Sequence, residues 1–206
     1  SRAANGWRPG SPKPNPVTDL DAQVAFLLEA DRLKSVNRAS YITDRSRHEN
    51  SAEHSWHIAL FAMVLEGEAP EGVDISRVIR MLILHDLVEI DAGDAPIHGR
   101  VDVAAMTARE EAAATRLFGM LPPAQGAAFR ALWEEFEAAR TPDARFAKAL
   151  DRFQPPVLNL ATDGGSWPDF GVTEDMITAR VAPAIQRGAP ALWQWLAPRI
   201  RAWFRS

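Results

Sequence analysis

Apolar residues recur at intervals of three and four along most of this 206-residue chain, a spacing that places them on one face of an α-helix. The pattern begins with Val24, Leu27 and Leu28 and returns in later segments that end at Gly, Pro or polar turns. The sequence shows no convincing alternation of apolar and polar residues, which is typical of a half-buried strand. The length suits one sizeable core but is short for two domains. The sequence therefore predicts a single all-α domain, a helical bundle of about seven or eight helices.

Capping and helix-breaking residues set the limits of the expected helices. These helices span residues 18–36, 51–70, 74–90, 101–119, 124–139, 141–162, 173–187 and 190–204. The adjacent Pro155 and Pro156 are expected to bend or end the helix that contains them. Residues 37–50 are polar and predict a loop. Residues 1–16 are rich in Pro, Gly and Asn and predict a flexible N-terminal segment, followed by one domain over residues 17–206.

Composition rules out several classes of protein and of site. The chain has no cysteine, so a metal would have to be held by nitrogen and oxygen ligands. The formal net charge of −4 provides no basic field that would attract nucleic acid. The sequence shows neither an apolar run of membrane-spanning length nor the apolar stretch of a secretion signal. We therefore expect a cytoplasmic protein that binds neither nucleic acid nor membranes.

The stretch LILHDLVEID, residues 82–91, places His85 and Asp86 in an apolar run that is typical of a buried helix. Desolvating such groups costs several kcal/mol unless they are paired or bound to a metal. A buried hydrogen-bonded pair is one explanation. The other is a metal site near the helix end, to which two more segments would bring His54 and Asp151. Imidazole and carboxylate ligands suit Mn, Co, Fe, Ni or Zn better than Mg.

Two further acids lie close to the His-Asp pair in the sequence. Glu89 follows Asp86 by three residues and His85 by four, so on a helix it projects over the same surface. This position suits a general base that orients an attacking water. Asp94 follows in a turn that contains Gly93, where it could share that role or bind a sugar hydroxyl. Carboxylates at helix ends and in turns are also common as purely structural residues.

Three segments of the chain resemble one family of enzymes. AEHSWHIALFA, LILHDLVEIDAGDAP and AKALDRFQPPVLN together are similar to the HD-domain metal-dependent phosphohydrolases, and most of all to their small single-domain branch, which resembles 5′-deoxynucleotidases. The resemblance covers roughly residues 18–160 and implies a helical HD domain that binds one divalent cation. The implied cation ligands are His54, His85, Asp86 and Asp151. The implied catalytic acids are Glu89 and Asp94, and the implied ligand of the substrate phosphate is Arg38.

The resemblance also implies a function. The branch hydrolyses (deoxy)nucleoside 5′-monophosphates to nucleoside and phosphate and is commonly dimeric; the apolar face of residues 190–204 would allow a homodimer. The chain departs from the family pattern where Ala39, and not an aromatic residue, follows Arg38, which weakens the prediction of sugar recognition. Three alternatives stay open: a nucleotide pyrophosphohydrolase, a hydrolase of another phosphate ester, and a non-catalytic helical module that binds metal.

Overall fold

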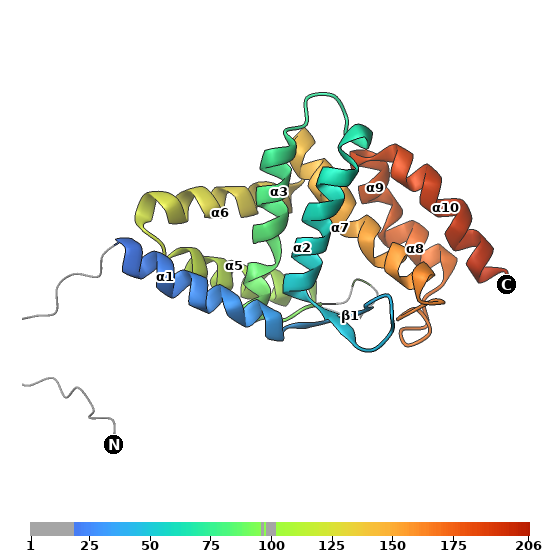
Figure 1. The fold of residues 1–206 in the computed structure, drawn as a ribbon, viewed down its shortest axis with the longest axis horizontal. Helices are drawn as coiled ribbons and strands as arrows, with labels where there is room; N and C mark the ends of the chain where they lie inside the picture. The colour runs from blue at the N-terminus through green and yellow to red at the C-terminus, as the bar shows by residue number, and fades with distance from the viewer. Residues whose placement is uncertain (1–18, 96, 98–101) are drawn as a thin grey trace, which may run out of the picture.

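A computed structural model of the protein describes residues 19–95, 97 and 102–206. Helices make up most of this part of the chain, and its two strands form one small antiparallel sheet (Figure 1). The prediction of an all-α domain is confirmed. The expected flexible segment, residues 1–16, lies outside the described residues. Among the helices of the described residues, none is both long enough and apolar enough to cross a lipid bilayer.

Two of the predicted helices each contain two α-helices, so the α-helices of the described residues slightly exceed the predicted number. The α-helices are α1 (Asp19–Ala30), α2 (Ser51–Val64), α3 (Ile75–Leu84), α4 (Glu89–Ala92), α5 (Val103–Phe118), α6 (Pro123–Ala138), α7 (Pro142–Ala161), α8 (Glu174–Arg180), α9 (Ala182–Gly188) and α10 (Pro190–Phe204). The short 3-10 helices are η1 (Asp31–Ser35), η2 (Glu66–Glu68) and η3 (His85–Val88). The helix expected over residues 74–90 becomes α3, η3 and α4, and the helix expected over 173–187 becomes α8 and α9. Pro183 lies in the first turn of α9, where proline is tolerated, and its ring prevents α8 from continuing.

The segment predicted as a loop, residues 37–50, contains a β-hairpin instead. Strand β1 (Asn37–Tyr41) pairs antiparallel with strand β2 (His48–Asn50). Strands of five and three residues are too short to show a clear alternation in the sequence, which explains the wrong prediction. The hairpin places Arg38 on β1 and Glu49 on β2.

Helix α7 is the central element, and most of the other helices pack around it. It contacts α2, α3 and α6 on one side of the molecule and α9 and α10 on the other (Figure 1). Phe146 and Leu150 of α7 are fully buried and belong to the same core as Ile58 of α2 and Met81 of α3. Because α2, α3 and α7 are neighbours, side chains from all three can meet inside the molecule.

The paired prolines do not end α7, which continues through Pro155 and Pro156 to Ala161. Proline has no N–H, so the carbonyls of Asp151 and Arg152 lose the donors that lie four residues farther along the helix. Packing compensates for this loss, because Pro156 and the residues that follow it on the same face are buried. Tertiary contacts therefore outweigh the local preference of the two prolines.

Candidate metal centre and active site

His54 lies in the first turn of α2, at a helix start that is fixed by side chains. The side chain of Asn50 accepts a hydrogen bond from the Glu53 N–H at 2.9 Å, and the Glu53 carboxylate accepts one from the Asn50 N–H at 3.1 Å. This reciprocal capping determines where the helix begins. It directs His54 toward α7 inside the core, where the imidazole is 0% exposed.

His85 and Asp86 lie where α3 tightens into the 3-10 helix η3. Both side chains are buried, and His85 Nε2 lies 2.9 Å from Asp86 Oδ1. The pair therefore lies at a helix end, as predicted, and both side chains reach the same place.

Asp151, in the middle of α7, meets the two imidazoles. Its Oδ1 lies 3.1 Å from His54 Nε2 and 3.7 Å from His85 Nε2. Each of these three residues offers one ligand atom within 4.8 Å of the others, and all three are buried. Asp86 adjoins them through Oδ1, whereas its Oδ2 accepts a hydrogen bond from Arg38 Nη1 at 3.0 Å. The fold thus brings together the four side chains that were predicted as cation ligands.

The hydrogen bonds of the two imidazoles leave both Nε2 atoms facing carboxylates. His85 Nδ1 lies 2.8 Å from the Leu82 carbonyl, and His54 Nδ1 lies 3.1 Å from Oε1 of Gln154. Both partners can only accept, so Nδ1 carries a hydrogen in each ring, and Nε2 of the neutral ring presents a lone pair. A lone pair beside a carboxylate is repulsive unless a proton or a cation lies between them, and the buried His85 Nε2 has no hydrogen bond. The donor set therefore fits a divalent cation that nitrogen and oxygen hold.

Charged neighbours outweigh burial in setting the pKa values of the cluster residues. Burial disfavours the charged form of His85, but the Asp86 and Asp151 carboxylates outweigh it and raise the His85 pKa to about 10. Burial also acts to raise the pKa of Asp86, but His85 and Arg38 lower it to about 2. The pKa of Asp151 falls well below its usual value despite burial, because Arg152 and the imidazoles favour the ionised form. Both carboxylates are therefore ionised at neutral pH, as cation ligands must be.

The predicted phosphate ligand and the two predicted acids lie together beside the cluster. The Arg38 side chain is only 12% exposed, and its Nη1 lies 3.6 Å from Asp94 Oδ1 and 3.9 Å from Glu89 Oε1. Ser51 Oγ donates a hydrogen bond to Glu89 Oε2 at 2.5 Å. Burial, and then the charge of Asp86, raise the Glu89 pKa to about 9 against the opposing effect of Arg38. Burial also raises the pKa of Asp94.

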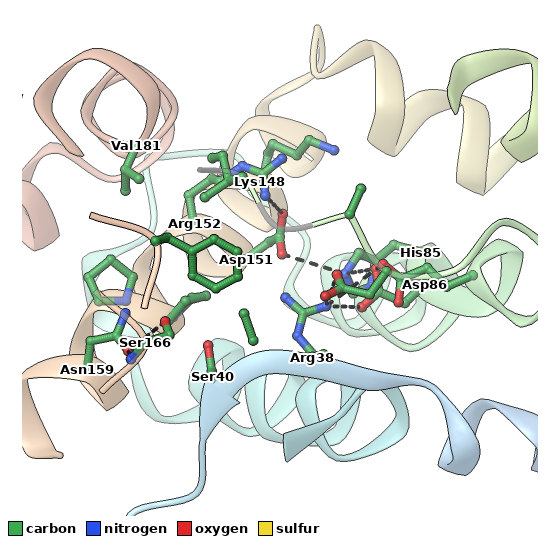
Figure 2. Close-up of a pocket in the computed structure, with 18 of the residues that line it drawn as sticks. Arg38, Ser40, His85, Asp86, Lys148, Asp151, Arg152, Asn159, Ser166 and Val181 are labelled. Atoms are coloured by element: carbon green, nitrogen blue, oxygen red, sulfur yellow. Dashed lines mark hydrogen bonds and ion pairs between the residues drawn. The ribbon is translucent and has the colours of Figure 1, made fainter. Parts of the chain in front are cut away.

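These groups border a pocket that extends along α7 (Figure 2). Residues labelled along its wall are Arg38, Ser40, His85, Asp86, Asp151, Asn159, Ser166 and Val181. Lys148 and Arg152 also line it, one helical turn apart, although neither was predicted as a site residue. Lys148 Nζ pairs with Glu137 at 3.1 Å, and Arg152 Nη1 lies 3.4 Å from Asp151 Oδ2. Cations from two elements, β1 and α7, therefore border the pocket.

Two buried polar residues next to the cluster were not among the predicted site residues. Gln154 is 0% exposed and contacts His54, and Glu49 is 3% exposed and contacts Gln154. Gln154 follows Asp151 by three residues, so helical spacing alone could have placed it on the same face. Glu49 carries no comparable signal, because it lies in the short strand that the sequence did not reveal.

A helical fold with a buried cluster of two histidines and an aspartate defines a domain whose centre suits a divalent metal. The sequence model of the HD domain matches residues 30–193 of the chain. The protein therefore belongs to the HD domain family, as the resemblance implied.

Individual relatives are consistent with this family. The 5′-deoxynucleotidase HDDC2 of Homo sapiens is 28% identical over 128 residues, which are 62% of this chain and 61% of that protein. The 5′-deoxynucleotidase HDDC2 of Danio rerio is 25% identical over 136 residues, 66% of each chain. The chain thus spans 61% and 66% of the length of these two curated relatives. A crystal structure described as a predicted metal-dependent phosphohydrolase from Magnetospirillum magnetotacticum MS-1 is 48% identical, with a TM-score of 0.86 over 91% of this chain and 96% of that one.

Proposed function

We propose that the protein is a divalent-metal-dependent phosphohydrolase that converts (deoxy)nucleoside 5′-monophosphates to nucleoside and phosphate. The observation that carries this proposal is the buried meeting of His54, His85 and Asp151 beside a pocket that acids and cations border. The names of the two HDDC2 relatives support a nucleotide substrate. The description of the Magnetospirillum structure supports phosphohydrolase chemistry.

The proposed cation ligands are His54, His85, Asp86 and Asp151. Two imidazole nitrogens and two carboxylates suit Mn, Co, Fe, Ni or Zn better than Mg, which prefers oxygen ligands. When bound, such a cation activates water at neutral pH and polarises a phosphoryl group. The protein's own contribution is to keep the carboxylates ionised and to orient the imidazoles through their Nδ1 contacts.

Arg38 is proposed to bind the substrate phosphate. Its guanidinium borders the pocket and is held there by charge interactions with Asp86, Glu89 and Asp94. Arginine is always charged, and its planar donors match the oxygens of a phosphate. Because these carboxylates hold the side chain in place before substrate arrives, little conformational entropy is lost on binding.

Glu89 is proposed to move the proton that the reaction requires, and Asp94 to assist it. Hydrolysis of a phosphomonoester takes a proton from the attacking water and adds one to the leaving ribose oxygen. A carboxyl group whose pKa is raised to about 9 holds its proton at neutral pH, so Glu89 can donate that proton to the leaving ribose oxygen. The hydrogen bond from Ser51 to Oε2 orients the group and leaves Oε1 on the side of Arg38. Asp94 lines the same pocket, where it can share this role or bind the sugar.

The catalytic domain is proposed to extend over residues 17–206 and to act on a small phosphate ester without nucleic-acid or membrane partners. A homodimer stays a prediction. The apolar face of α10 suggested this dimer, but most of that face packs within the protein itself. Its residues Leu192, Leu196 and Ile200 are buried in the core. Trp195 of the same helix is 45% exposed.

A hydrolysis screen of 5′-mononucleotides with Mn, Co, Fe, Zn and Mg tests the proposal. We expect phosphate release, and loss of turnover in Asp86→Ala with an unchanged circular-dichroism spectrum. Asp91→Ala is the matched control, because Asp91 pairs with Arg116 away from the cluster and its loss should leave turnover unchanged. Pyrophosphate release from nucleoside triphosphates would favour the pyrophosphohydrolase instead. Absence of turnover with every metal and ester would favour the non-catalytic module.

A further inference from the structure

A buried polar network lies on the Nδ1 side of His54, and Gln154 is its centre. Oε1 of Gln154 lies 3.1 Å from His54 Nδ1, and its Nε2 lies 2.7 Å from Glu49 Oε1. The same Nε2 lies 3.1 Å from His57 Nδ1. Gln154 is 0% exposed and Glu49 is 3% exposed, so the network is shielded from solvent. Neither residue has a part in the reaction proposed above.

The carboxylate of Glu49 decides which way the Gln154 amide points. Glu49 Oε1 accepts the hydrogen bond from the amide nitrogen of Gln154, so the amide oxygen faces His54. His57 fits this orientation, because burial lowers its pKa and so leaves Nδ1 free to accept the second N–H of the amide. The reversed amide would place its oxygen against the Glu49 carboxylate, which is repulsive.

We propose that Glu49 and Gln154 act together as positioning residues that fix the tautomer of His54, an inference that rests on the proposed role of His54 as a cation ligand. With the amide oxygen against Nδ1, that nitrogen carries the hydrogen, and Nε2 directs its lone pair toward Asp151. A reversed amide would donate to Nδ1 and leave the hydrogen on Nε2, where it would block coordination. Glu49 therefore acts on the cation site through two relayed hydrogen bonds.

The second oxygen of Glu49 connects this network to the proposed phosphate ligand. Glu49 Oε2 is buried without a hydrogen bond and lies 3.7 Å from Arg38 Nε and 3.6 Å from His54 Nδ1. Arg38 Nε is likewise buried without a hydrogen bond. One carboxylate thus orients a cation ligand by hydrogen bonding and holds the phosphate ligand by charge.

Cation affinity tests the inference without requiring turnover. Gln154→Leu removes the amide, and we expect it to weaken Zn²⁺ or Co²⁺ binding by about 10- to 100-fold. Loss of a hydrogen bond to the other ring nitrogen of a metal-ligating histidine generally has an effect of this size. Thr162→Val is the matched control, because it removes another buried hydrogen bond at the end of α7, from Thr162 Oγ1 to the Leu158 carbonyl. Calorimetric titration of the full chain, with a chelator as competitor, measures both affinities.

Exchanging the two residues provides a variant that restores the network. In Glu49→Gln combined with Gln154→Glu, the amide at position 49 donates to the carboxylate at position 154, which still accepts from His54 Nδ1. Gln154→Glu alone would place two carboxylates at the 2.7 Å contact and should weaken binding. We expect the exchange to recover most of that loss and to restore the visible absorption spectrum of bound Co²⁺. A merely structural role predicts no such recovery.

The outcomes separate this inference from the proposed function. Weaker binding in both Gln154 variants, with recovery in the exchange, supports the inference. Wild-type affinity in both variants, or no recovery in the exchange, would overturn it and leave the cation site intact. If the wild-type protein binds Zn²⁺ and Co²⁺ no better than His54→Ala does, the proposed function fails, and the inference fails with it.

Discussion

Glu89 and Asp86 lie one helical turn apart and have opposite protonation states at neutral pH. Burial and the charge of Asp86 raise the Glu89 pKa to about 9, although Arg38 opposes them. His85 and Arg38 lower the Asp86 pKa to about 2, although burial opposes them. Acid–base enzymes commonly rely on two neighbouring carboxyl groups whose environments shift their pKa values in opposite directions. Here one carboxylate remains an anion that suits a cation, and the other can carry a proton.

Glu89→Gln tests the proposed role of this proton. The amide keeps the size of the side chain and can still accept the hydrogen bond from Ser51, but it cannot exchange a proton. We expect kcat to fall by about 10²- to 10⁴-fold. Cation affinity should change little, because Glu89 is not a proposed ligand. Steady-state kinetics and calorimetric titration measure the two quantities, and a kcat within a few-fold of wild type would exclude a catalytic role for this acid.

At the scale of elements, the helices were largely predictable because their signals are local. Side chains of Asp74 and Thr141 cap α3 and α7, and such caps can be recognised in a sequence. The hairpin could not be predicted, because its strands are short and its stability comes from packing. The change from α-helix to 3-10 helix at His85 could not be predicted either, because the apolar pattern continues through it.

The site, like the fold, could be predicted from the sequence only in part. The proposed ligands and acids could be singled out because their residue types are unusual in apolar surroundings and match a family pattern. Glu49 and Gln154 lie 105 residues apart, and only the packing of the hairpin against α7 brings them into contact. Helical spacing could have placed Gln154 near Asp151, but the contact with Glu49 leaves no periodic or local signal in the sequence. The supporting network was therefore missed, whereas the proposed cation ligands could be singled out in the sequence.

Asn50→Ala tests whether the start of α2 positions His54. Loss of this cap should lower the free energy of unfolding by about 1 kcal/mol, measured by urea denaturation. Because His54 lies in the first turn, cation affinity should fall as well. Asp102→Ala removes the same type of cap from α5, where the Asp102 side chain accepts from the Ala105 N–H at 3.1 Å. This control should be destabilised to a similar degree with unchanged cation affinity. Equal affinities in the two variants would show that the cap of α2 does not position His54.

At the scale of the whole molecule, several carboxyl groups gather around Arg38 and the proposed cation site. Glu49, Asp86 and Asp151 are buried, and Glu89 and Asp94 are half-buried. Buried charges that are incompletely paired are costly to the folded state. A cation that binds only the folded chain stabilises it by about 2.7 kcal/mol when its concentration is 100 times Kd. Stability and the proposed activity should therefore depend on the same ion, and a chelator should lower Tm.

The pH dependence of cation affinity follows from the protonation of His85. Its pKa of about 10 means that the imidazole holds a proton at neutral pH, and this proton must leave before Nε2 can bind a cation. The Asp86 and Asp151 carboxylates are already ionised in this range. Affinity should therefore rise between about pH 6 and 8, by up to about tenfold per pH unit for each proton released. Calorimetry in buffers of different ionisation enthalpy counts these protons, and affinity that is independent of pH would contradict the mechanism.

One divalent cation is proposed to bind between His54, His85, Asp86 and Asp151. Diffraction from crystals of the full chain grown with Mn²⁺ or Zn²⁺, recorded at the absorption edge of the metal, tests it most directly. We predict one strong anomalous difference peak in contact with Nε2 of both imidazoles and with both carboxylates. A peak at another place, or no peak in crystals that elemental analysis shows to contain the metal, would contradict the claim.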